Sequence, residues 1–191
     1  MAPKAIETRY KGYRFRSRLE ARWAVFFDTA GIDYEYEKEG FDLDDSGWYL
    51  PDFWLPNTTV HGISGCWVEV KPDGVSQCEK LAALCEQANC YGLLVSGAPA
   101  PLGKLKWPSN LSECPPRTDD GWGMHFPEGM DENWTILKCG DCGRTKFAYW
   151  TNSETFWCDH CQCAWMRADH FGLLMAYSAA RSARFEHGET A

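Results

Sequence analysis

Apolar side chains recur along the first hundred residues with two different periods, and each period predicts a type of element. Residues 17–31 have apolar positions at helical spacing, with Ser17 as the expected N-cap and Gly31 as the C-terminal stop. A second amphipathic helix is predicted over 76–89. Alternating or continuous apolar runs predict strands over the ranges 32–37, 47–55, 66–71 and 91–96.

The order of these elements is helix, three strands, helix, strand. Three consecutive strands favour a meander, and the last strand, helix and strand favour a parallel crossover. We therefore expect an α/β core of αβββαβ order within residues 1–97. The range 98–136 is rich in proline and glycine and predicts a linker or cap. The range 137–191 contains a cysteine-rich segment followed by an apolar, helix-like stretch.

Composition makes this a globular chain. It has 191 residues, 45% of them hydrophobic, and ten tryptophans. No apolar run approaches the roughly 20 residues needed to cross a bilayer, and the N-terminus has no apolar signal-peptide region. The sequence predicts a protein that contacts no membrane and stays in a reducing cytoplasm.

Charge is unevenly distributed along the chain. The formal net charge is −8, yet the first 22 residues carry seven basic and two acidic side chains, a net +5, which leaves −13 for the rest. A basic segment on an acidic body can bind phosphates locally, and a solvated basic face explains the pattern equally well. The candidate DNA contacts in this segment are Arg14, Arg16 and Arg18.

Two carboxylates and a lysine interrupt strands that otherwise have the pattern of buried core. Glu69 and Lys71 share one face of their strand because side chains alternate with a period of two. Asp52 follows Pro51 near the preceding strand. If the two strands pair, Asp52 and Glu69 converge on one ion. Carboxylate and carbonyl oxygens are the ligands that Mg²⁺ prefers, and a neighbouring lysine can orient water.

Pro51-Asp52 followed by Glu69-Val70-Lys71 resembles the signature of the PD-(D/E)xK nucleases, which have a restriction-endonuclease-like fold. The resemblance covers residues 12–97 and implies Mg²⁺- or Mn²⁺-dependent hydrolysis of DNA phosphodiesters. It implies that Asp52, Glu69 and the carbonyl of Val70 hold the ion and that Lys71 positions the water. It further implies the following roles: Glu20 completes the shell or binds a second ion, and Gln77 and Lys80 contact phosphate.

Each of these residues also has a structural interpretation. Ser17 and Glu20 have the spacing of a capping box, in which Glu20 satisfies backbone N–H groups at the helix start. Glu69 and Lys71 can form an ion pair on an exposed strand, and Asp52 can be a turn acid after proline. Gln77 and Lys80 can be ordinary polar surface residues.

Four cysteines form two CxxC pairs separated by fifteen residues: Cys139, Cys142, Cys158 and Cys161. Two turns that each present two thiolates make a tetrahedral Zn²⁺ site, so the segment predicts a zinc ribbon. His160 or Cys163 is close enough in sequence to replace one ligand. The ribbon can be a structural staple or a DNA-contacting module.

The sequence thus predicts a metal-dependent DNA endonuclease with a C-terminal zinc ribbon. Its size and appended ribbon resemble nucleases encoded by phages or mobile elements. Cleavage of both strands of a duplex favours a homodimer, and the acidity of the chain favours either a nuclease that needs a targeting protein partner or the non-catalytic alternative below. The alternative function is a non-catalytic adaptor that retains the nuclease fold and binds nucleic acid or protein through its ribbon.

Overall fold

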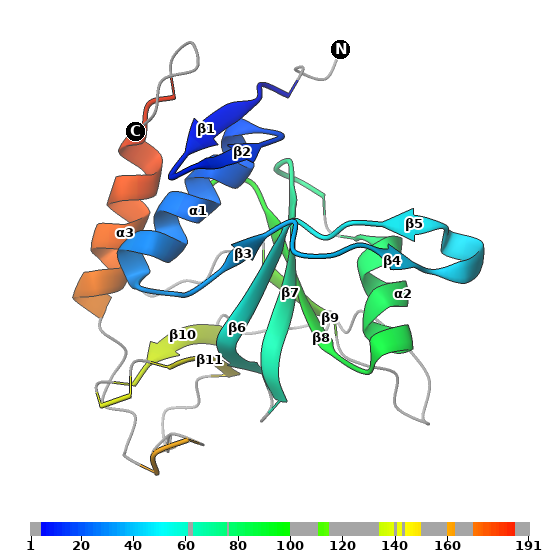
Figure 1. The fold of residues 1–191 in the computed structure, drawn as a ribbon. Coiled ribbons are helices and arrows are strands. Elements are labelled where there is room, and N and C mark those ends of the chain that lie inside the picture. The colour runs from blue at the N-terminus through cyan, green and yellow to red at the C-terminus, as the bar shows by residue number, and fades with distance from the viewer. Residues whose placement is uncertain are drawn as a thin grey trace.

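A computed structural model of the chain describes residues 5–60, 63–75, 77–99, 111–114, 134–139, 141–142, 144–149, 160–162 and 170–185. These residues form a mixed α/β fold (Figure 1). The helices are α1 (Arg18–Ala30), α2 (Glu79–Ala88), α3 (His170–Ser182) and the short 3₁₀ helix η1 (Asp44–Ser46). The strands are β1 (Thr8–Tyr10), β2 (Tyr13–Phe15), β3 (Glu35–Tyr36), β4 (Phe41–Asp42), β5 (Trp48–Tyr49), β6 (Phe53–Val60), β7 (Ile63–Lys71), β8 (Tyr91–Ser96), β9 (Leu111–Cys114), β10 (Trp134–Lys138) and β11 (Thr145–Tyr149).

The main sheet has the order β10-β11-β6-β7-β8-β9, and β3 also pairs with β6. Strands β6 and β7 are antiparallel, whereas β7 and β8 are parallel and connected by α2. The predicted parallel crossover is therefore confirmed. Strand β3 pairs with the start of β6 and β11 pairs in parallel with its end, so one edge of β6 is shared by two distant segments.

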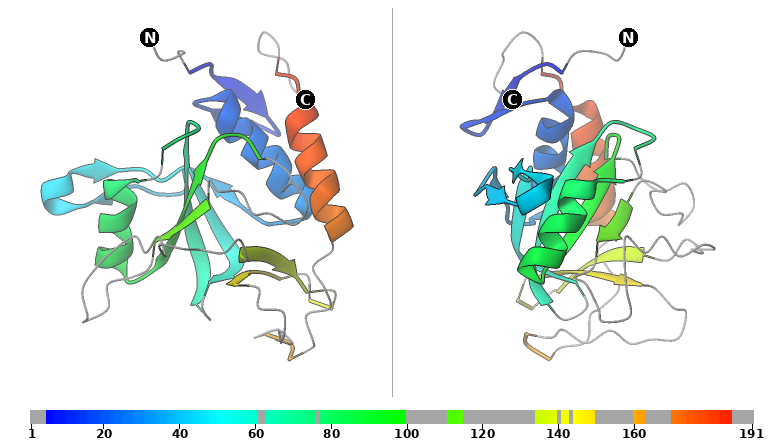
Figure 2. Two further views of the ribbon diagram at one scale, coloured as in Figure 1. Left: turned by 180° about the vertical axis from the view of Figure 1, so that it is seen from behind. Right: turned by 90° about the vertical axis from the view of Figure 1, so that its right-hand side faces the viewer.

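Helices cover both faces of this sheet, as the views in Figure 2 show. One face, formed by residues such as Phe53, Val68 and Val95, packs against α1 and α3 in the larger hydrophobic core. The other face, with Trp67 and Leu94, packs against α2 in a smaller core. Since side chains alternate along a strand, Glu69 and Lys71 lie on the α2 side, with Trp67.

The predicted ends of α1 are confirmed. The side chain of Ser17 accepts a hydrogen bond from the backbone N–H of Glu20, and Gly31 ends the helix in the left-handed conformation at φ 65°. Helix α2 is shorter than predicted: it begins at Glu79, with Cys78 as its N-cap, and ends at Ala88, with Asn89 as a C-cap at φ 48°. Residue 76 lies outside the described residues.

The predicted strand over 47–55 is wrong as a single element. Strand β5 pairs only with β4, and β6 starts at Phe53. Pro51 lies between them and has no N–H to donate to a ladder, so the chain leaves one sheet and enters another there. Strands β4 and β5 with η1 between them form a separate hairpin, which we call the flap (residues 41–49). The strand predicted over 32–37 is reduced to Glu35–Tyr36.

The basic N-terminal segment contains a hairpin, β1 and β2, that the apolar pattern does not predict. Beyond residue 97, strands β9, β10 and β11 join the main sheet, and α3 packs against α1 (Figure 1). The predicted division at residues 97 and 136 stays a prediction, but the sheet and the helical layer continue across both boundaries. No helix in the described part of the chain combines the length and apolar character needed to cross a bilayer.

Candidate active site and cysteine cluster

Asp52 and Glu69 are brought together by the pairing of β6 with β7. Phe53 pairs with Val68 in antiparallel register, which places Asp52 opposite Glu69 one step further along the ladder. Both side chains are buried, with 3% and 5% of their surface exposed. Two carboxylates in one buried place repel each other unless a cation neutralises them, so this arrangement has an electrostatic cost in the absence of a cation.

The Asp52 carboxylate is held by two donors. The backbone N–H of Val70 donates to Oδ2 at 2.7 Å, and Nη2 of Arg16 lies 2.5 Å from Oδ1. Burial, followed by the charges of Glu69 and Glu20, raises the pKa of Asp52 to about 8 despite these two contacts. Ionisation of Asp52 is therefore less favourable than for an ordinary aspartate, and a bound cation would favour it.

Both carboxylate oxygens of Glu69 accept hydrogen bonds. Tyr49 donates its hydroxyl proton to Oε2 at 2.8 Å, and Lys71 donates from Nζ to Oε1 at 2.5 Å. Burial lowers the pKa of Lys71, but the hydrogen bond and charge of Glu69 outweigh burial and raise it. Lys71 is thus an ammonium at neutral pH. It can orient or polarise a neighbouring group, but it is not a base in this state.

Glu20 belongs to the N-terminal cap of α1, as its structural interpretation predicts, but its carboxylate reaches the backbone N–H of Arg16, one residue before the N-cap Ser17. Its carboxylate accepts hydrogen bonds from Ser17 Oγ at 2.6 Å, from the Tyr36 hydroxyl at 2.6 Å and from the Arg16 backbone N–H at 3.0 Å. Among the described residues, Glu20 does not join Asp52 and Glu69 in a group of oxygens within 4.8 Å of one another. Its charge nevertheless contributes to the raised pKa of Asp52.

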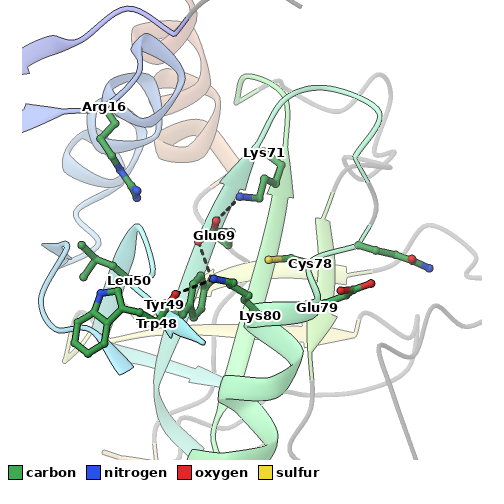
Figure 3. A pocket seen from close by; sticks show the side chains of 10 residues that line it. Arg16, Trp48, Tyr49, Leu50, Glu69, Lys71, Cys78, Glu79 and Lys80 are labelled. Carbon is green, nitrogen blue, oxygen red and sulfur yellow. Dashed lines mark hydrogen bonds and ion pairs between the residues drawn. The ribbon is translucent and has the colours of Figure 1, made fainter. Parts of the chain in front are cut away.

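An open pocket of about 700 Å³ lies over Glu69 and Lys71 (Figure 3). Arg16 reaches it from the segment before α1, and the flap contributes Trp48 and Tyr49. Gln77 and Lys80, the predicted phosphate contacts, also line this pocket, and both are exposed. The fold therefore brings predicted site residues that are more than 60 positions apart in sequence, such as Arg16 and Lys80, onto one concave surface.

The three candidate arginines have different surroundings. Arg16 forms ion pairs with both Asp52 and Glu37, and its Nε atom lies 2.8 Å from Oε1 of Glu37. Its positive charge is therefore next to the carboxylate of Asp52. Arg14 is exposed and pairs with Glu7, and Arg18 is exposed at the first position of α1. Only Arg16 lines the pocket.

Sequence reasoning missed the tyrosines of the site. Tyr49 and Tyr36 each donate a hydroxyl hydrogen bond to a buried carboxylate, Glu69 and Glu20 respectively. Both lie in strands before Asp52, and an aromatic residue in a strand pattern is usually interpreted as part of the hydrophobic core. The signal available was their hydroxyl group, because a buried tyrosine usually needs a polar partner.

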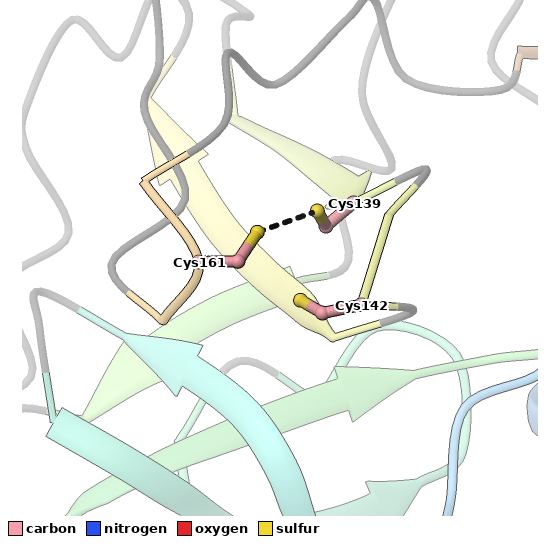
Figure 4. Close-up of side chains that lie close together, drawn as sticks. All are labelled: Cys139, Cys142 and Cys161. Carbon is pink, nitrogen blue, oxygen red and sulfur yellow. Dashed lines mark hydrogen bonds between the residues drawn. The ribbon is translucent and has the colours of Figure 1, made fainter.

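A second site lies at the turn between β10 and β11 (Figure 4). The sulfur atoms of Cys139, Cys142 and Cys161 all lie within 4.8 Å of one another, and the Sγ atoms of Cys139 and Cys161 are 3.6 Å apart. Two sulfurs bound to one Zn²⁺ at about 2.3 Å in tetrahedral geometry lie about 3.8 Å apart. The three thiols are therefore compatible with a metal such as zinc.

The turn itself is well suited to present thiols. The Cys139 N–H donates to the carbonyl of Arg144 at 2.9 Å, which closes the loop between the two strands. Cys139 is buried and Cys161 is exposed. His160 is exposed and does not belong to the three-thiol group, while Cys158 and Cys163 lie outside the described residues.

Comparisons with known proteins were made at three levels. No protein-family model, no curated protein and no solved structure matches this chain.

Proposed function

We propose that this protein is a metal-dependent DNA endonuclease that resembles the PD-(D/E)xK superfamily. The observation that carries the proposal is the pair of buried carboxylates, with Asp52 directly before β6, Glu69 on the paired strand β7, and Lys71 two residues after Glu69. Support also comes from the order α1, β3, β6, β7, α2, β8, with β6–β7 antiparallel and β7–β8 parallel.

The donor set fits a hard divalent cation. Asp52 and Glu69 offer carboxylate oxygens, which Mg²⁺ and Mn²⁺ prefer, and the carbonyl of Val70, the residue between Glu69 and Lys71, is a further oxygen donor. Burial and then the charges of Glu69 and Glu20 raise the pKa of Asp52, and a bound cation would relieve that charge repulsion. A divalent ion held there would supply electrostatic stabilisation of the negative charge that develops on a phosphodiester.

Lys71 and Arg16 supply the positive side of the site. Lys71 contacts Glu69 and lines the pocket, so its ammonium can hold a water molecule or a phosphate oxygen beside the carboxylates. Arg16 contacts Asp52, and about half of its side chain is exposed, so it can turn toward a bound phosphate. Glu20 has a positioning role in this proposal, because its carboxylate accepts hydrogen bonds from Ser17 at the start of α1 and from Tyr36.

In this proposal the cysteine cluster is a zinc ribbon with Cys158 as the fourth ligand. Strand β11 pairs with β6, the strand that follows Asp52. Zinc at the β10–β11 turn would stabilise that edge of the sheet, which favours a structural role for the metal. Contact between the ribbon and DNA is a further role that the same segment can serve.

Nicking of supercoiled plasmid DNA tests the proposal. We expect relaxed product with Mg²⁺ or Mn²⁺ and none with EDTA. Asp52→Asn should reduce the rate by at least about 100-fold, because it removes a metal ligand. Asp45→Asn is the matched control, since Asp45 is exposed on η1. Equal nicking by wild type and Asp52→Asn refutes the proposal.

A non-catalytic adaptor is the second candidate, and one observation favours it. Both acids already have a cationic partner from the protein itself, Arg16 for Asp52 and Lys71 for Glu69. Such an ion-pair network can be purely structural. Binding of DNA or protein without any metal-dependent cleavage, and with the same affinity in Asp52→Asn, would establish the adaptor.

A further inference from the structure

Trp48 is the most exposed large apolar side chain among the described residues, with 65% of its surface accessible. It belongs to the flap and lines the pocket that contains Glu69 and Lys71. Within the described part of the chain, no aromatic ring stacks on it. Because more than half of the side chain is open, at least one flat face of the indole is available to a ligand.

The indole is nevertheless held in a defined place. It lies against Gly40, where a Cβ atom would come within 2.2 Å of Cζ2 of the ring. Glycine at position 40 therefore allows the ring to rest on the backbone. The Trp48 carbonyl accepts a hydrogen bond from Nζ of Lys80 at 2.8 Å, which ties this strand of the flap to α2.

The other strand of the flap is anchored as well. Phe41 packs edge-on against Trp67 with the ring centroids 5.1 Å apart, and Gln87 of α2 donates to the carbonyl of Asp42 at 3.1 Å. An exposed aromatic ring on an anchored hairpin has little conformational freedom left to lose when a ligand binds.

Three cationic side chains line the same pocket beside the acids Glu69 and Glu79. Arg16, Lys71 and Lys80 line it together with Trp48 (Figure 3). Positive groups that follow a phosphate backbone, combined with an aromatic ring for a base, are the features of sites for single-stranded nucleic acid. A base inside a duplex is stacked on both faces, and only the terminal pair has a free face, so an unpaired base is the one that can place its face on Trp48 away from a duplex end.

We propose that Trp48 is a stacking platform for an unpaired base next to the cleavage point. The substrate class is then DNA with a single-stranded part, such as a tail, flap or gap, in preference to continuous duplex. This inference rests on the proposed nuclease function for its position near the cleavage point, while the stacking itself is a binding property that can be measured separately.

Binding is measured by fluorescence anisotropy in Ca²⁺ with three labelled DNAs: a single strand, a blunt duplex and a duplex with a single-stranded tail. Wild type should bind the single strand and the tailed duplex more tightly than the blunt duplex. Trp48→Ala should weaken binding of the single strand by about 5- to 150-fold, which corresponds to one stacked base. In the same variant, the ratio of the affinity for the tailed duplex to that for the blunt duplex should fall toward one.

Three further variants separate stacking from folding. Trp48→Phe should restore most of the affinity because it keeps a ring. Gly40→Ala should weaken single-strand binding with the indole intact, since the new Cβ displaces the ring. Leu174→Ala, at an apolar residue of α3 that is 53% exposed, should change nothing. Thermal melts confirm that each variant is folded.

The outcomes distinguish this inference from the proposed function. If wild type binds all three DNAs equally, binds none, or loses the same affinity for all of them in Trp48→Ala, the stacking platform is wrong even where plasmid nicking succeeds. If nicking fails with both Mg²⁺ and Mn²⁺ but the predicted binding pattern appears, the nuclease proposal is wrong and the stacking platform stands.

Discussion

The backbone N–H of Val70 donates a 2.7 Å hydrogen bond to the carboxylate of Asp52. This contact ties Asp52, which directly precedes β6, to the backbone of β7 at the residue between Glu69 and Lys71. It also favours the ionised form of Asp52, but burial and the charge of Glu69 are stronger and leave the pKa raised. The site is therefore under electrostatic strain that either a proton or a metal cation relieves.

Stability of the metal-free protein should decrease as pH rises. The pKa of Asp52 is raised from 3.8 to about 8, so between these values the folded state holds a proton that the unfolded state has lost. The free energy of unfolding should fall across this window and level off above about pH 8. Urea titrations in EDTA measure it, and the difference between wild type and Asp52→Asn isolates this carboxyl. A difference that grows in favour of wild type as pH rises would contradict the prediction.

Lys71→Met should slow cleavage by about 100-fold or more while DNA affinity in Ca²⁺ changes little. The ammonium of Lys71 contacts Glu69 beside the proposed metal and would act on the reacting groups more than on the bound DNA. Single-turnover rates and binding curves separate the two quantities. If affinity and rate fall together, Lys71 is a phosphate contact.

Glu20→Gln should fold like wild type, within about 1 kcal/mol, because an amide can serve the capping box formed with Ser17. It should lower the pKa of Asp52, since it removes one of the charges that raise it. It should retain measurable cleavage. NMR titration of Asp52 and a nicking assay check these expectations. Unchanged stability with abolished cleavage would instead assign Glu20 to the metal.

About one zinc per chain should survive purification without added metal, and Cys139→Ser should release it. Cys139 is buried at the β10–β11 turn within 4.8 Å of the two other thiols, so a serine there removes a ligand at the base of the cluster. Elemental analysis measures the zinc. Cys90→Ser, outside the cluster, should keep it, and a zinc-free wild type with alkylated Cys142 would refute the site.

Tyr177→Ala should destabilise the protein by about 3 kcal/mol or more, as for other buried aromatic truncations. Tyr177 of α3 packs on Phe26 of α1 with ring centroids 4.7 Å apart and is 7% exposed.

Because α3 covers this face of α1, a fragment of residues 1–97 should fail to fold alone. Urea denaturation measures the variant, and a stable, soluble fragment would show that α3 is dispensable.

The local pattern was sufficient for elements whose energetics are local. The caps Ser17 and Gly31 bracket α1 as predicted, since a cap acts within one turn of its helix. The same holds for Glu69 and Lys71, whose shared face follows from strand periodicity. Contacts between distant segments could not be derived in this way. Two examples are the contact of Arg16 with Asp52 and the docking of α3 on α1. Both depend on how the chain turns back on itself, which no short stretch of sequence predicts.

The split of the predicted strand at Pro51 has a similar cause. Trp48, Tyr49, Phe53 and Trp54 all have high strand propensity, so the pattern continues across the proline. Which sheet each half joins is decided by partners elsewhere, Phe41 for one and Val68 for the other. The flap that presents Trp48 is a product of that tertiary choice.

The docking of α3 on α1 also bears on how the chain is made. About 150 residues separate Phe26 of α1 from Tyr177 of α3, which packs on it, so a ribosome must synthesise all of them before this surface is buried. At about 5–20 residues per second, roughly 8–30 s pass between synthesis of α1 and synthesis of α3. During that interval, chaperones and proteases compete with folding. Premature termination upstream of α3 would release a product that exposes this face and is prone to aggregation.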